Sequence, residues 1–89
     1  MAGDIERLEQ EISALLAVYG AGVNSASRVI NPLLQIWSTA QEIDPTVALP
    51  IQVLLTALAH RALITGEELT SVLDEARSAL EGLATPSAV

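Results

Sequence analysis

Apolar residues recur every three or four positions along much of the chain, which is the spacing of helices that bury one face. The first run includes Ile5, Leu8, Ile12, Leu15 and Tyr19, and similar runs cover residues 26–43 and 69–83. No segment alternates apolar and polar residues over a sustained length, and no segment repeats another. The pattern predicts an all-α protein, a compact bundle of four or five short antiparallel helices joined by short loops.

The second predicted helix contains Pro32, which leaves two interpretations open. Proline lacks an N–H and clashes with the carbonyl four residues earlier, here that of Arg28. In one interpretation Asn31 caps a new helix whose first residue is Pro32. In the other, a single helix over residues 25–42 kinks near Arg28. The second helix is therefore expected to be broken or kinked near Pro32.

Proline and threonine predict where the later helices begin. Asp44 and Pro45 are typical of a cap and a first turn, and Pro50 is then expected to open the main third helix, which would run to about Ile64. Nearly every direction around that helix is apolar, which places it at the centre of a bundle or between subunits. Thr65 and the glutamate three residues later form a capping-box pattern that predicts the start of the last helix.

Glycines predict the ends of the first and last helices. Gly20 and Gly22 follow the first apolar run, and Gly82 lies near the end of the last. Residues 1–84 are therefore expected to form a single helical domain, and residues 85–89 a flexible C-terminal tail.

Charge and composition narrow the classes of partner. The chain has 89 residues, a net charge of −7, no Lys and no Cys. Its acidity argues against nucleic acids and anionic membranes, because both require Lys or Arg to offset phosphate charge. Yet 51% of its residues are hydrophobic, which is a large share for a domain with so small an interior. The surplus indicates a protein partner or a homo-oligomer. We expect a cytoplasmic protein with no membrane span, since no run of about 20 apolar residues is free of charges.

Candidate chemistry is sparse. His60 is the only histidine, and the residues three and four positions away from it are Thr, Ala, Leu and Ile, none of which suits a metal site. The acids lie on the polar faces of the predicted helices, where they favour solubility rather than catalysis. We therefore expect no catalytic, cofactor-binding or metal-binding residues, and no enzyme.

Two local resemblances keep other functions open. The spacing of Ala62, Gly66 and Val72 resembles that of DNA-binding helix-turn-helix proteins, although the helix that would read DNA is acidic. Residues 22–26 resemble the segment of acyl carrier proteins that bears their modified serine, which would place the prosthetic group on Ser25. Asn24 here replaces the aspartate of that motif.

The functional prediction is a non-enzymatic helical interaction module, either self-associating or an accessory or structural subunit of a larger assembly. The alternative is a small acidic carrier or a bundle that binds an apolar ligand, with a DNA-binding regulator less favoured and a small-molecule ligand disfavoured. The interface candidates are the apolar residues of the first stripe, the single tryptophan and two residues of the third helix: Ile5, Leu8, Ile12, Leu15, Tyr19, Trp37, Leu54 and Leu58.

Overall fold

A computed structural model describes residues 2–84 and contains four helices and two very short strands. Helix follows helix with little connecting chain, and a single residue, Asp44, separates the second helix from the third. The elements are α1 (Ala2–Tyr19), β1 (Val23–Ser25), α2 (Ala26–Ile43), α3 (Pro45–Leu58), β2 (Leu63–Thr65) and α4 (Gly66–Ala84).

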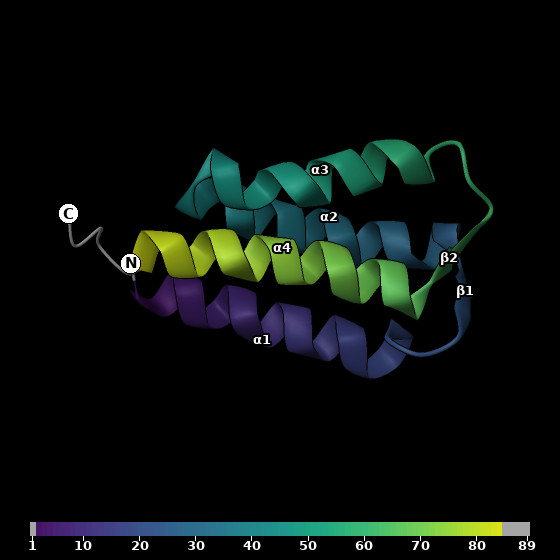
Figure 1. Cartoon of the computed structure of the whole chain (residues 1–89), viewed down its shortest axis with the longest axis horizontal. Coiled ribbons are helices and arrows are strands. Elements are labelled where there is room, and N and C mark those ends of the chain that lie inside the picture. Colours follow the sequence, from purple (N-terminus) through teal and green to yellow (C-terminus); the bar gives the residue numbers. More distant parts are fainter. Residues whose placement is uncertain (1, 85–89) are drawn as a thin grey trace.

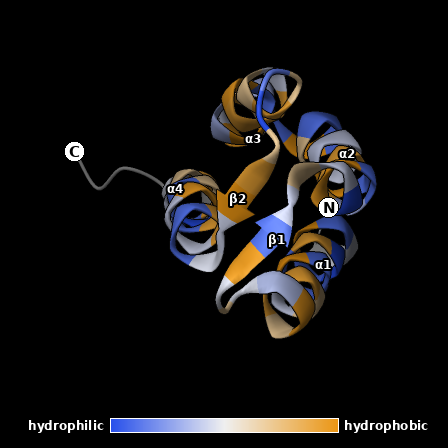
Figure 2. Ribbon diagram, turned by 90° about the vertical axis from the view of Figure 1, so that its right-hand side faces the viewer, coloured by the Kyte–Doolittle hydropathy of each residue, from blue (hydrophilic) through white to orange (hydrophobic). Residues whose placement is uncertain are grey.

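The helices run alternately up and down and occupy the corners of a bundle (Figures 1 and 2). Each helix packs on its neighbours in chain order, and α4 closes the arrangement against α1. The prediction of an all-α bundle of antiparallel helices is confirmed, with four helices within residues 2–84. Each half of the chain has the same element order, helix–strand–helix, which the sequence does not reveal as a repeat.

The two strands form an antiparallel pair across one end of the bundle (Figure 2). Asn24 lies opposite Ile64 at the centre of the pair, and Ile64 is buried. The backbone N–H of Gly66 donates to the carbonyl of Gly22 at 2.8 Å, which continues the pairing beyond the strands. This ladder joins the α1–α2 connection to the α3–α4 connection and so fixes the two halves to each other.

One hydrophobic core runs through the bundle and receives residues from every helix and from β2. The predicted apolar stripes of α1, α2 and α4 supply most of it, as their helical spacing implies. Its largest fully buried side chains are Leu8, Ile12, Val29, Leu33, Ile36, Val47, Ile51, Leu58, Ile64, Leu69, Leu73 and Leu80.

The structure resolves the alternatives at Pro32 in favour of one helix. Helix α2 runs without interruption from Ala26 to Ile43 and contains Pro32, so Asn31 does not cap a separate helix. Of the two interpretations, the new helix at Pro32 is therefore wrong and the single helix is confirmed. Pro32 leaves the carbonyl of Arg28 without its helical donor, and Arg28 lies on the exposed side of α2.

The third helix differs most from its predicted bounds. Helix α3 begins at Pro45 and ends at Leu58, so Pro50 lies inside it and residues 63–65 belong to a strand. The expected cap is confirmed, because the Asp44 carboxylate accepts from the backbone N–H of Thr46 at 2.8 Å. Pro45 in the first turn lacks only an N–H that has no partner within the helix.

The last helix begins as expected and ends later. The Thr65 hydroxyl accepts from the backbone N–H of Glu68 at 3.2 Å, which is one half of a capping box. The Glu68 side chain turns instead to Arg61. Gly82 lies inside α4, which continues to Ala84. The expected tail, residues 85–89, lies outside the described residues.

Candidate interaction groove

Most of the predicted interface residues lie in the core of the chain itself. Leu8, Ile12, Leu15, Leu54 and Leu58 are all buried by the bundle. Their side chains satisfy the helical pattern by packing within this chain, so they offer little surface to another molecule. A shared interface remains a prediction for these residues. Leu15 and Leu54 each border one of the two surface hollows described below.

The other predicted residues are partly buried. Ile5, Tyr19 and Trp37 pack against the core without entering it fully. The indole nitrogen of Trp37 is buried and has no hydrogen-bond partner within residues 2–84. Trp37 therefore contributes its ring to the bundle, and it borders neither of the two hollows described below.

Helix α3 exposes two large apolar side chains on one side. Leu49 and Val53 are 55% and 62% exposed, and they lie one turn apart on the outer side of the helix. No residue of α3 carries a charge. Exposed polar side chains of this helix, such as Gln52 and Thr56, are neutral. The outer side of α3 therefore exposes apolar surface to water, without the charges found elsewhere on this acidic protein.

These side chains border a groove between α3 and α4, here called the α3–α4 groove. Its volume is about 590 Å³, and it is open to solvent. Its lining is mainly apolar, with Leu54 at its buried floor. The lining residues are Thr46, Leu49, Pro50, Val53, Leu54 and Ala57 of α3, Arg61 of the following loop, and Glu68, Val72, Glu75 and Ala79 of α4.

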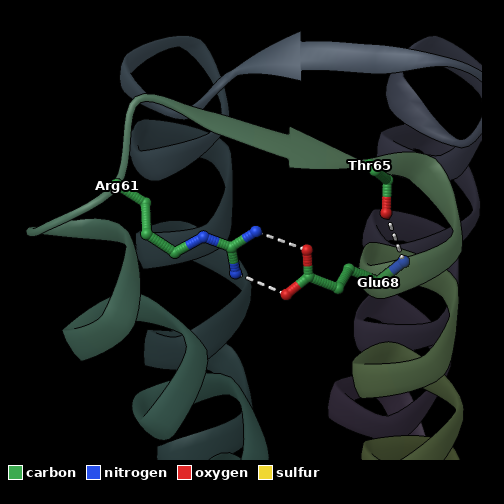
Figure 3. Close-up of polar contacts among 3 residues, drawn as sticks. All are labelled: Arg61, Thr65 and Glu68. Carbon is green, nitrogen blue, oxygen red and sulfur yellow. Dashed lines mark hydrogen bonds and ion pairs between the residues drawn. The ribbon is translucent and has the colours of Figure 1, made fainter.

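An ion pair bridges the groove where α3 passes into β2 (Figure 3). Arg61 follows α3, and its guanidinium makes two parallel hydrogen bonds to the Glu68 carboxylate in the first turn of α4, one of them 2.6 Å long. The hydrogen bonds from Arg61 lower the pKa of Glu68 below its ordinary value, and the same bonds raise the pKa of Arg61. Both groups are exposed to solvent, so the pair is geometrically defined but weakly stabilising.

Glu75 is the second carboxylate of the groove. It lies between Val72 and Ala79 along the α4 side and is exposed. Within residues 2–84 no ion pair involves it, whereas the other acid of the groove, Glu68, is held by Arg61. The α4 side therefore presents one unneutralised negative charge at the centre of an apolar surface.

A smaller hollow lies on the opposite half of the bundle, between α1 and α2. It has a volume of about 360 Å³ and is also open. Glu11 borders it with one buried oxygen that has no hydrogen-bond partner in the described part of the chain. Its other oxygen lies 3.6 Å from Arg7 Nε and 3.4 Å from Gln35 Nε2. The charge of Glu11 is thus already balanced by Arg7, unlike that of Glu75.

Sites for other chemistry are sparse in the described residues. Within residues 2–84 no group of three His, Asp or Glu side chains is placed to hold a metal ion, and none of the helices there is long and apolar enough to cross a membrane. His60 is exposed in the turn after α3 rather than inside a helix. The Ser25 hydroxyl contacts that of Ser27 at 2.9 Å and makes no cap bond.

Comparison with known proteins yields no match: no family model, curated protein or solved structure corresponds to this chain.

The sequence indicated the third helix, which forms one side of the groove, and of the residues that line the groove it singled out Leu54 alone. An apolar pattern on all sides of this helix predicted a place at the centre of a bundle or between subunits, and the structure leaves one side of α3 exposed. Leu49 and Val53 were not distinguishable from Ile51 and Leu54, because the identity of the outward face depends on where α2 and α4 pack. Glu75 was assigned to a solvated face, and its position beside the groove follows only from the antiparallel packing of α4 on α3.

Proposed function

We propose that this chain is a non-enzymatic helical interaction module that binds another protein chain along the α3–α4 groove. The observation that carries the proposal is the exposed apolar face of α3 beside a groove with a buried apolar floor. Removing apolar surface from water stabilises association by roughly 25 cal/mol per Å² before the costs of ordering are subtracted. Two large exposed side chains one turn apart provide anchors for such an interface.

A photo-crosslinking experiment in the source cells tests this function at one position. Benzoyl-phenylalanine replaces Val53 in the groove, and in a matched chain it replaces Leu34, an exposed leucine of α2 that borders neither hollow. We expect a discrete protein adduct from position 53 that is absent from position 34. Adding Leu49→Asp to the position 53 chain should abolish the adduct, while circular dichroism and the melting temperature confirm that the bundle is intact.

Two results would contradict the proposal. Equal adducts from positions 53 and 34 would mean that the contact is not specific to the groove. A folded chain with no adduct at position 53 would mean that the groove is unoccupied in the cell. Light scattering on the purified chain then identifies whether the bound chain is a second copy or a different protein.

A further inference from the structure

The shape of the α3–α4 groove matches a helix. Its α4 side is formed by Glu68, Val72, Glu75 and Ala79, which are spaced four, three and four residues apart. With a rise of 1.5 Å per residue, these positions span about 16 Å, or three helical turns. Two packed helices with an open groove between them can receive a third helix by the same ridge-and-groove packing that forms bundles.

The negative charge of Glu75 indicates which residues should flank the apolar face of that helix. Glu75 lacks an ion pair and lies between two apolar positions, so a ligand that covers the groove brings its own polar group close to this carboxylate. An apolar group there would remove water from the charge without replacing it, which is unfavourable. A Lys or Arg side chain would cover the apolar surface with its stem and place its charge at Glu75.

A second copy of the chain does not offer such a helix. Each copy carries a net charge of −7, and its only cations are four arginines. Helices α1, α2 and α4 contain one each but pack their apolar stripes into the core, whereas α3, whose outer side is apolar, contains none. Arg61 is already bound to Glu68, and Arg7 lies beside Glu11. Within residues 2–84 a second copy therefore has no helix that combines an exposed apolar face with a basic flank.

We propose that the occupant of the α3–α4 groove is an amphipathic helix of a different protein, of at least three turns. Its apolar face fills the space beside Leu49, Val53 and Val72, and a Lys or Arg at its flank pairs with Glu75. This inference rests on the proposed function and names the chemistry of the partner.

The probe is a pair of synthetic helical peptides of about 18 residues, long enough to hold some helix in water. Both carry Leu at positions i, i+4, i+7 and i+11, with Lys and Arg flanking the apolar stripe in one peptide and Glu at the same places in the other. Backbone amide shifts of the full-length protein locate the binding site, and calorimetry gives Kd. We expect the basic peptide to bind and to shift residues of α3 and α4, and the acidic peptide not to bind.

Charge-reversed variants separate a pairing at Glu75 from attraction to an acidic protein in general. Glu75→Lys and Glu9→Lys change the net charge equally, and both positions are exposed, but Glu9 lies on α1. We expect Glu75→Lys to weaken the basic peptide about three- to tenfold more than Glu9→Lys. Val53→Asp should abolish binding, whereas Leu34→Asp should leave it unchanged.

The contradictory outcomes are distinct from a failure of the proposed function. Equal affinity for the acidic and basic peptides, or equal loss from the two lysine variants, would overturn the charge complementarity. An adduct between two copies at position 53 would make a second copy the occupant. In that case the interaction module stands and the basic helix does not. Shifts confined to α1 and α2 would also overturn the inference.

Discussion

The two halves of the bundle have the same order of elements but expose different side chains to solvent. In the first half, α1 buries Leu8 and Ile12 and covers its outer side with charged residues such as Glu6 and Glu9. In the second half, α3 occupies the corresponding place, buries Ile51 as completely, and exposes Leu49 and Val53 on an outer side without charges. Burial inside the chain is therefore satisfied in both halves. What distinguishes them is the surface that remains. The first half exposes Val18 beside a hollow of about 360 Å³, whereas the second half exposes Leu49 and Val53 together along a groove of about 590 Å³ on an uncharged helix.

The largest expected effect tests whether the two faces of α3 are as different as their burial implies. Ile51→Ala should destabilise the protein by about 2–5 kcal/mol, because it leaves a cavity in the core. Val53→Ala, two residues away and exposed, should change stability by less than about 0.5 kcal/mol. Urea unfolding measures both. Similar losses from the two substitutions would mean that Val53 is buried in solution, and the contrast between α1 and α3 would disappear.

The next effect compares the glycines that join the halves. A Cβ on Gly66 would overlap the backbone of Gly20 and Ala21, which cannot move aside as a flexible side chain could. Gly66→Ala should therefore cost about 3 kcal/mol. Gly22 has open space around it but a positive φ of 74°, so Gly22→Ala should cost only about 1 kcal/mol.

Thermal unfolding of both glycine variants provides the measurement. A larger loss of stability for Gly22→Ala would indicate that the positive φ of Gly22 constrains the sequence more than the close approach of the two connections at Gly66 does. The strand pairing between β1 and β2 would then be less constrained than the structure shows.

A smaller effect comes from the caps of the helices. The Asp44 carboxylate accepts a backbone hydrogen bond at the start of α3, whereas Ser25 makes no such bond at the start of α2. Asp44→Ala should cost about 1 kcal/mol, and Ser25→Ala should be close to neutral. Urea unfolding measures the difference, and an equal loss from both would show that Ser25 caps α2 in solution.

How much of this could be predicted from the sequence depends on the length of each element. The stripes of α1 and α4 extend over several turns, so their spacing alone indicates both the helix and its buried face. The strands contain three residues each, too few to show an alternation, and their partners lie about 40 positions apart in the chain. Pairing across that distance is set by the packing of the helices, which local patterns do not encode.

The third helix shows the limit most clearly. Because apolar residues surround it, its pattern did not indicate which side is buried. Its first residue was inferred from a proline. Pro50 resembled a first residue, yet it lies one turn inside a helix that Asp44 and Pro45 begin. The residues of the α3–α4 groove were difficult to predict for a related reason. A stripe such as Leu8 and Ile12 predicts burial without saying whether the chain itself or a partner supplies the cover, and here the chain does.

The smallest expected effect concerns the side-chain hydrogen bonds at the connection between the two helices of each half. In the first half, Asn24 donates from its side-chain amide to the Tyr19 carbonyl at 2.9 Å, a neutral contact that does not titrate. In the second half, the Arg61–Glu68 pair does titrate. Because Arg61 lowers the pKa of Glu68 in the folded chain, the stabilisation is present above the unfolded value of about 4.3 and is lost as the pH falls through the lower folded value.

The stability difference between the natural chain and Glu68→Gln should therefore be small at neutral pH and should shrink as the solution becomes more acidic than about pH 4.3. Denaturant unfolding across this range measures it, and 1 M salt should reduce it. Glu68 also lies in the first turn of α4, where the helix dipole favours a negative charge. Arg61→Gln separates the two causes. If the pH dependence of the Glu68→Gln difference survives in an Arg61→Gln background, the dipole and not the guanidinium stabilises the carboxylate. The Arg61–Glu68 ion pair would then contribute nothing to the stability of the second half.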